Sequence, residues 1–199
     1  MKIGRIKMSK ENSTYSTLIL LSGGIDSAAL VRYHISQGDA IEAIFFDYGQ
    51  KSYKQELLAA KQISEHYGIK LHHKKLGFKL GDNDGEYYCR NALFILAGCG
   101  HTKVPVSLIS IGIHSGTPYY DSSPIFIKDI QHILDGYFGG ATRVIAPFLK
   151  YSKSQVYKYA MESGVPIQLT YSCELGQVEP CGKCLSCIDR GILNESASI

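Results

Sequence analysis

The stretch LILLSGGIDSAALV, residues 18–31, contains the transition on which the predicted fold depends. Residues 17–21 form a short apolar run with branched side chains, which is typical of a buried strand. From Asp26 to Tyr33 the apolar residues recur at helical spacing, and Gly38 stands where a glycine commonly ends a helix. The sequence therefore predicts a strand, a glycine turn and a helix in immediate succession.

The turn between this strand and this helix indicates an anion-binding site. Its two glycines let the backbone approach a ligand without a Cβ atom in the way, although glycines in such turns can also have a purely steric role. The first N–H groups of the helix point outward with the positive end of the helix dipole behind them, which suits a pyrophosphate group. The carboxylate of Asp26 could help to position Mg²⁺. The nucleotide-binding residues predicted here are Leu21, Ser22, Gly23, Gly24, Ile25, Asp26 and Ser27.

Composition limits the class of protein. With 199 residues, 45% of them apolar, the chain can bury the core of one domain. A net charge of +3 and a pI near 8.4 fit an ordinary solvated surface, so a nucleic-acid partner is not expected. No apolar run approaches the roughly 20 residues that cross a bilayer. The polar first residues do not resemble a signal peptide, so we expect a cytoplasmic protein with no membrane partner.

Short apolar runs alternate with helical patterns along the chain. Strands are predicted at residues 17–21, 41–46, 69–73, 106–111 and 143–145. This alternation is typical of an α/β fold with a doubly wound parallel sheet. Ser123 before Pro124, and Ser152 with Gln155, predict the starts of two of the helices. We assign residues 1–169 to a nucleotide-binding domain and residues 170–199 to a C-terminal segment packed on it.

Polar residues after the second strand and a long loop after the fourth are candidates for ligand binding. In such sheets ligands bind outside the carboxyl ends of the strands, so Asp47, Tyr48 and Gln50 could reach the nucleotide beside Ser22. A surface turn is the alternative interpretation. The loop GIHSGTPYYDSS, residues 112–123, is where substrate specificity would be built.

Four of the six cysteines predict a metal site. Cys173, Cys181, Cys184 and Cys187 have a spacing that can close tetrahedrally on Zn²⁺. Four thiolates leave no open position for water, so the ion would be structural; an iron–sulfur cluster is the alternative. By contrast, His72 and His73 alternate across a strand, so we expect them not to share one ion and assign them no role.

SGGIDS resembles the SGGxDS signature of the PP-loop ATP pyrophosphatase superfamily. Members of that superfamily cleave ATP between its α- and β-phosphates and adenylate a substrate. A Walker loop is excluded, because no Gly-Lys-Ser/Thr follows the turn.

Several further motifs, in order from about residue 18 to residue 190, resemble the 7-cyano-7-deazaguanine synthase family. They are FDYGQK, a Cys-Arg-Asn-apolar segment, YYD at 119–121, the helix with Lys153, and TYSC followed by CGKCLSCIDR. The resemblance implies a homodimeric ligase of queuosine-type biosynthesis with a four-cysteine zinc site. Such an enzyme uses ATP and ammonia to convert the carboxylate of 7-carboxy-7-deazaguanine to an amide and then to a nitrile.

The resemblance also implies roles for individual residues. Ser22, Asp26 and Lys153 would be catalytic. Arg90 and Asn91 would bind the nucleotide together with the glycine turn. Tyr120 and Asp121 would belong to the substrate loop.

The chain departs from the family pattern where the substrate should be held. Lys51 and Ser52 stand where the family has Arg and His, and Tyr119–Phe126 lacks the Arg of the family's Y-P-D-C-R motif and the acidic residue that follows it. A segment of the family before Arg90 is also missing. A relative that ligates its carboxylate to a different amine, on a protein or a nucleic acid, is therefore one alternative. A tRNA thiolase and a non-catalytic, zinc-stabilised nucleotide-binding module are others.

Overall fold

The computed structural model describes residues 16–81, 87–102, 106–116 and 119–197. Five parallel strands form one sheet in the order β3-β2-β1-β4-β5. The strands are β1 (Ser16–Leu20), β2 (Ala40–Asp47), β3 (Lys70–Lys75), β4 (Leu108–Ser110) and β5 (Arg143–Ile145). The predicted doubly wound parallel sheet is thus confirmed, with its change of direction between β1 and β4.

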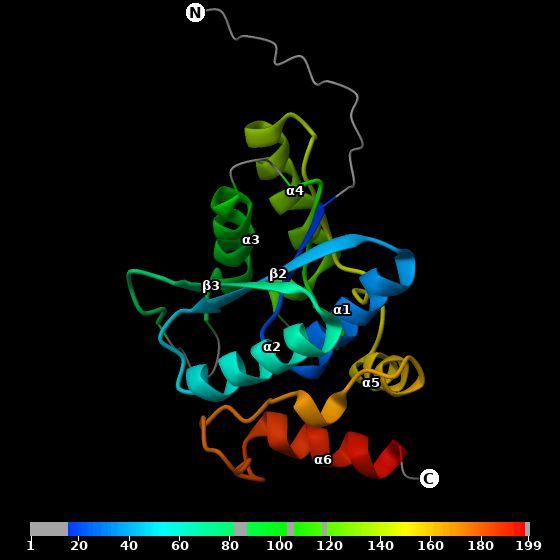
Figure 1. Ribbon diagram of the computed structural model, residues 1–199. Coiled ribbons are helices and arrows are strands. Elements are labelled where there is room, and N and C mark those ends of the chain that lie inside the picture. The colour runs from blue at the N-terminus through cyan, green and yellow to red at the C-terminus, as the bar shows by residue number, and fades with distance from the viewer. Residues whose placement is uncertain (1–15, 82–86, 103–105, 117–118, 198–199) are drawn as a thin grey trace, which may run out of the picture.

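Helices cover both faces of the sheet (Figure 1). On one face lie α1 (Ile25–Gln37), α2 (Tyr53–Tyr67), α5 (Lys153–Glu162) and α6 (Leu185–Ala197). On the other lie α3 (Arg90–His101) and α4 (Pro124–Phe138), and two single 3₁₀ turns occur at Tyr120–Ser122 and Ile167–Leu169. Over the described ranges, no helix combines the length and apolar character needed to cross a membrane.

The central strand β1 is buried on both faces. Leu18 and Leu20 point into the core beneath α3 and α4, whereas Ile19 and Leu21 point into the core beneath α1, α2 and α5. A strand with two covered faces has no solvent-facing positions, which explains its nearly continuous apolar sequence. The glycine turn at its carboxyl end is consequently anchored by the most buried strand of the sheet.

Most helix boundaries follow the local signals in the sequence. Gly38 and Gly68 end α1 and α2 in the left-handed conformation. The Ser123 hydroxyl accepts a hydrogen bond from the N–H of Phe126, and Ser152 and Gln155 form the predicted capping box. Strand β4, however, is shorter than the predicted 106–111, because its partner β5 has only three residues.

Helix α6 was not predicted, because its residues were interpreted only through the spacing of their cysteines. It packs on α5, where the Tyr157 hydroxyl donates a hydrogen bond to Asn194 Oδ1 at 2.6 Å. Leu193 of α6 joins the core on this face of the sheet. The boundary at residues 169 and 170 remains a prediction.

A buried polar cluster ties the end of α1 to β4. His34 is 1% exposed; its Nδ1 lies 2.6 Å from Asp39 Oδ2 and its Nε2 lies 2.9 Å from Ser110 Oγ. Serine, histidine and aspartate in this order resemble a hydrolytic triad, but Ser110 is fully buried and no substrate can reach it. The cluster therefore serves the fold, since each of these polar groups has a partner inside the protein.

We expect His34→Ala to lower the free energy of unfolding by about 3 kcal/mol, because the buried Ser110 hydroxyl loses its partner and a cavity remains. Urea unfolding of the two proteins measures the difference. His132, which is exposed on α4, provides the control, since His132→Ala should leave stability within about 0.5 kcal/mol. Equal stability of His34→Ala and the unmodified chain would contradict the proposed role of the cluster.

Candidate functional site

The glycine turn has the conformation that an anion site requires. Gly23 has φ +86°, and a Cβ atom there would lie 2.6 Å from the carbonyl oxygen of Glu56 in α2, so only glycine fits. Gly24 is the N-cap of α1, and no side chain accepts a hydrogen bond at this cap. The N-terminal end of α1 therefore keeps N–H groups available for a ligand.

Two cavities meet at this turn. The sheet-end cavity, about 420 Å³ in volume, lies at the carboxyl ends of β1, β2 and β4. The α6-side cavity, about 300 Å³, lies between the turn, α5 and α6. Both cavities are lined by Ser22, Gly24, Asp26, Glu56, Arg90 and Ser186. A ligand bound at the start of α1 can consequently extend in both directions.

Asp26 lies at the junction of the two cavities. Burial raises the pKa of its carboxyl group, and the charges of His114 and Lys153 oppose this shift. His114 Nε2 is 3.8 Å from Asp26 Oδ2, while the Nδ1–H of His114 donates to the carbonyl oxygen of Ser115. His114 was missed as a single residue, although it stands in the loop that the sequence singled out.

The other residues of the signature have different positions. Leu21 and Ser27 line the sheet-end cavity, and Ile25 lines the α6-side cavity. The Ser27 hydroxyl donates to the carbonyl oxygen of Gly24 at 2.9 Å, and the Ser22 hydroxyl donates to Ser27 Oγ at 3.2 Å. Ser27 thus stabilises the turn, whereas the exposed Ser22 is available to a ligand.

Lys153 contributes a positive charge to the α6-side cavity. Its Nζ lies 2.6 Å from Asp189 Oδ2 on α6, and both side chains are partly exposed. Arg190 lines the same cavity but donates to the carbonyl oxygens of Ile167 and Thr170 and to the Thr170 hydroxyl. Arg190 therefore holds the main chain before the cysteines, and Lys153 is the more accessible cation.

The residues of the DYGQ motif mainly stabilise one another. Asp47 is not among the lining residues of either cavity, and its carboxylate accepts a hydrogen bond from the N–H of Gly49. Gln50 is 6% exposed; it accepts from the N–H of Tyr48 and donates to Phe46 O and Glu56 Oε2. Of the four residues of this motif, Tyr48 and Gln50 line the sheet-end cavity.

Glu56 is a residue of the site that the sequence did not reveal. Its Oε1 accepts from the Ser52 hydroxyl at 2.6 Å and its Oε2 accepts from Gln50 Nε2 at 3.0 Å. These two bonds hold the carboxylate at the wall that both cavities share. The available signal was its position on the first turn of α2, four residues after Ser52.

The first residues of α3 complete the sheet-end cavity. Arg90 lines both cavities, and Asn91 is buried with its Nδ2 3.4 Å from the carbonyl oxygen of Asp121. Tyr48, whose pKa burial raises to about 12, lies against this wall with Phe94, their ring centroids 5.2 Å apart. The sheet-end cavity therefore has aromatic side chains on one wall, and the guanidinium of Arg90 lies where it joins the α6-side cavity.

The two predicted substrate-loop residues, Tyr120 and Asp121, face different surroundings. Asp121 lines the sheet-end cavity. Tyr120 is 58% exposed, and its hydroxyl donates to Asp129 Oδ2 on α4, so it faces away from the cavity. Tyr119 and Ser122 line both the cavity and an open surface groove of about 680 Å³, which also contains Tyr120.

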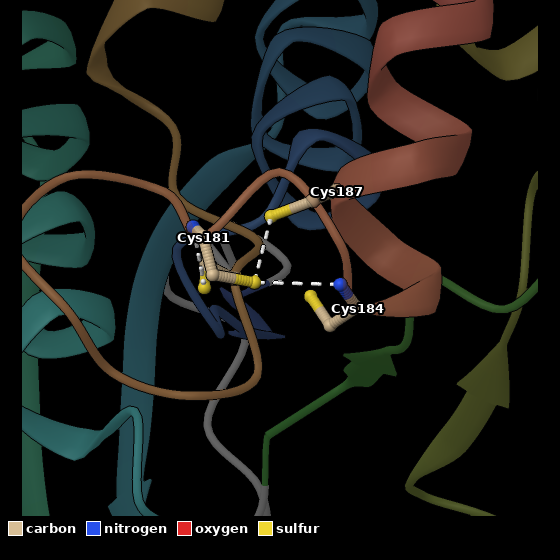
Figure 2. Close-up of side chains that lie close together, drawn as sticks. Cys181, Cys184 and Cys187 are labelled. Atoms are coloured by element: carbon tan, nitrogen blue, oxygen red, sulfur yellow. Dashed lines mark hydrogen bonds between the residues drawn. The ribbon is translucent and has the colours of Figure 1, made fainter.

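The four predicted cysteines lie together, and Figure 2 shows Cys181, Cys184 and Cys187 of this group. Their sulfur atoms all lie within 4.8 Å of one another, and the Sγ atoms of Cys181 and Cys187 are 3.9 Å apart. Thiolates bound tetrahedrally at about 2.3 Å from one ion are about 3.8 Å apart, so the cluster fits a single metal ion. Iron–sulfur clusters spread their thiolates around several iron atoms, which this spacing does not match.

Hydrogen bonds lower the pKa of two of the four thiols, Cys173 and Cys181, whereas burial raises the pKa of Cys187 to about 12. The N–H of Cys181 donates to Cys173 Sγ, and the N–H of Cys184 donates to Cys181 Sγ. Burial opposes ionisation of Cys173, but hydrogen bonds from the N–H groups of Cys181 and Leu175 outweigh it and lower its pKa to about 6. Thiolates are the form of cysteine that binds metal.

The cysteine segment also forms one wall of the α6-side cavity. The N–H of Tyr171 donates to the carbonyl oxygen of Gly23 at 2.9 Å. Glu174 accepts hydrogen bonds from the N–H and the hydroxyl of Ser186, which places the start of α6 at the cavity. A Cβ atom on Gly176 would collide with the carbonyl oxygen of Lys51, so this segment rests directly on the start of α2.

Comparison with known proteins leads to the same family as the sequence motifs. The family model described as "Queuosine biosynthesis protein QueC" matches residues 16–83 and 87–194. A 7-cyano-7-deazaguanine synthase from Aquifex aeolicus is 32% identical over 87% of this chain and 93% of its own length. A synthase of the same name from Persephonella marina is 32% identical over 88% of this chain and 90% of its own length.

Among solved structures, the U34-tRNA thiolase NcsA from Methanococcus maripaludis, described with its [4Fe-4S] cluster, has a TM-score of 0.54. It is 16% identical and covers 94% of this chain and 66% of its own, so the similarity concerns the fold alone. The match to the family model covers nearly the whole described chain, so it is stronger evidence for the family than the structural similarity is. This chain belongs to the QueC family, whose named relatives are 7-cyano-7-deazaguanine synthases.

Proposed function

We propose that the chain is an ATP-dependent ligase that activates the carboxylate of 7-carboxy-7-deazaguanine as an acyl-adenylate and converts it with ammonia to the nitrile. The observation that supports this most is the uncapped start of α1, which opens onto two joined cavities. An adenylating enzyme needs such an arrangement, because the α-phosphate must contact a second substrate on one side while pyrophosphate leaves on the other.

The triphosphate would lie along the start of α1. The N–H groups after Gly24 would bind its oxygens, and Lys153 would neutralise charge in the α6-side cavity. The aromatic sides of the sheet-end cavity, formed by Tyr48 and Phe94, suit a flat heterocycle. Arg90 lines both cavities and can contact an anionic group in either.

The proposed chemistry proceeds by two activations. A carboxylate oxygen attacks the α-phosphorus of ATP, the bond from that phosphorus to the bridging oxygen breaks, and pyrophosphate leaves. Ammonia then attacks the acyl carbon, loses a proton and displaces AMP to give the amide. The amide oxygen then attacks the α-phosphorus of a second ATP and a second pyrophosphate leaves; loss of AMP and of the two N–H protons gives the nitrile. The N–H groups at the start of α1 would stabilise the charge that develops on pyrophosphate.

Two metals would support this reaction. Mg²⁺ would be held by Asp26 and the triphosphate oxygens, and it would supply charge neutralisation on the phosphates. Zn²⁺ would be bound by Cys173, Cys181, Cys184 and Cys187, whose sulfur spacing fits one tetrahedral ion. The zinc would be structural, because four thiolates leave no position for a substrate.

A second candidate function is ligation of the carboxylate to a larger amine. The open groove that shares Tyr119 and Ser122 with the sheet-end cavity favours it, because ammonia needs no such groove. The altered loop also lacks the Arg and acidic residue of the family pattern. In this version the first activation is unchanged, and an amine on a protein or nucleic acid displaces AMP. The homodimer and the cytoplasmic location implied by the resemblance remain predictions.

Incubation with ATP, Mg²⁺, 7-carboxy-7-deazaguanine and ammonium tests the proposal. We expect AMP to form only when the carboxylate is present, with the nitrile detected by mass spectrometry. AMP that accumulates only with a larger amine would favour the second candidate. Absence of AMP with every acceptor would contradict both and leave a non-catalytic nucleotide-binding module.

Asp26→Asn should lower the rate of AMP formation by at least about 100-fold, because the side chain at the junction of the cavities loses its charge. Differential scanning calorimetry should show that the variant folds. Isothermal titration calorimetry should show that it still binds ATP, since the N–H groups at the start of α1 are unchanged. The matched control is Glu162→Gln, an exposed carboxylate on α5 that pairs only with Lys158 among the described ion pairs. Unaltered turnover of Asp26→Asn would remove Asp26 from the mechanism.

Cys184→Ala should abolish binding of one zinc ion per chain and lower the thermal unfolding midpoint, because structural zinc contributes directly to folding. Elemental analysis and calorimetry measure the two effects. Cys89→Ala is the control, since Cys89 is exposed and outside the four-cysteine cluster. A Cys184→Ala protein that retains a full equivalent of zinc would show that the ligand set is wrong.

A further inference from the structure

A second group of metal-ligating side chains lies at the edge strand β3, among residues to which we had assigned no role. His72 and His73 point to opposite faces of the sheet, as predicted. The ring of His73 lies 5.8 Å from those of Phe45 and Tyr53. On the other face, His72 Nδ1 lies 3.1 Å from Nε2 of His101, the last residue of α3.

Glu42 orients this histidine pair. Its Oε2 lies 2.6 Å from His72 Nε2, and this hydrogen bond is the main cause of the lowered pKa of Glu42. The carboxylate accepts a hydrogen bond from the Nε2–H group of His72, and in the tautomer with this single N–H the Nδ1 atom presents its lone pair to His101. A metal-binding histidine typically has this arrangement, with a carboxylate on the ring nitrogen that does not bind the ion.

We propose that His72 Nδ1 and His101 Nε2 form a binding site for a divalent transition-metal ion such as Zn²⁺ or Ni²⁺, oriented by Glu42. Imidazole nitrogens are suitable ligands for these ions. Water would occupy the remaining coordination positions. The site lies outside the four-cysteine cluster and outside both cavities of the candidate active site.

The distance between the two nitrogens fits this assignment. Ligand nitrogens about 2.05 Å from one ion are about 2.9 Å apart at a right angle and about 3.3 Å apart at a tetrahedral angle. The observed separation of 3.1 Å lies between these values. The two nitrogens now face each other in a hydrogen bond, so an ion requires both rings to rotate toward it, and the shared proton moves to His101 Nδ1 or to solvent.

Charge and exposure set the expected strength of the site. Both histidines are half-buried, so water and an ion can reach them from the edge of the sheet. Burial and the charge of Lys74 lower the pKa of His101. Lys70, 3.5 Å from Glu42 Oε1, and Lys74 oppose a bound cation. We therefore expect weaker binding here than at the cysteines.

Nickel titration of the full chain, without an affinity tag and with zinc bound at the cysteines, tests the proposal. Calorimetry should detect one Ni²⁺ bound per chain at this site, with no zinc released. His101→Ala and His72→Gln should each weaken that binding by at least about 10-fold, and Glu42→Gln should weaken it by about 10-fold. His132→Ala, which alters an exposed histidine on α4, should leave it unchanged.

Two results would overturn the proposal: nickel affinity unaffected by both His101→Ala and His72→Gln, or nickel uptake matched by release of an equal amount of zinc. Circular dichroism and thermal unfolding of each variant establish that it is folded. The measurement needs neither ATP nor a deazaguanine, so its outcome is independent of the proposed function.

Discussion

The backbone hydrogen bond from Tyr171 to Gly23 joins the two parts of the chain on which the candidate site depends. Gly23 belongs to the anion-binding turn, and Tyr171 stands two residues before the first cysteine of the metal cluster. Without that segment, the start of α1 would have the ends of the strands on one side and solvent on the other. A structural metal bound by the four cysteines would explain their presence in this fold, because the ion would fix a loop that otherwise has little core of its own.

The topology of the sheet explains why the site forms here. The chain moves outward from β1 through β2 to β3 and then returns to place β4 on the other side of β1. The connections after β1 and β4 therefore diverge and leave space at their carboxyl ends. Gly112, just beyond β4, approaches so closely that a Cβ atom there would lie 3.1 Å from the carbonyl oxygen of Asp26. Close packing on this side keeps the start of α1 aligned with the cavity.

The parts of the structure that follow from local chemistry were predictable. The glycine turn, the helix caps and the four cysteines each depend on residues close together in sequence, so their patterns indicated their structure directly. The roles of residues that depend on tertiary contacts could not be predicted from the sequence. Gln50 was predicted as a nucleotide ligand, but its hydrogen bond to Glu56 could not be predicted, and Glu56 itself resembled any acidic residue in a first helical turn. His72 had no evident role because His101, its partner, comes 29 residues later.

The predicted substrate loop, residues 112–123, also combines features that follow from the local sequence with features that depend on tertiary contacts. The family pattern draws attention to the arginine and the acidic residue that residues 119–126 lack. The structure shows which contacts hold Tyr120 and Asp121 in place. Asn91 Nδ2 contacts the carbonyl oxygen of Asp121, and Tyr120 is drawn toward Asp129 on α4. Without the arginine of the family pattern, the described part of this loop presents less positive charge to the sheet-end cavity. Arg90, supplied by α3, still places a guanidinium at the junction of the two cavities. In the proposed function this cation would lie near both the carboxylate and the α-phosphate, so activation would persist even where recognition of the substrate and its amine partner diverged.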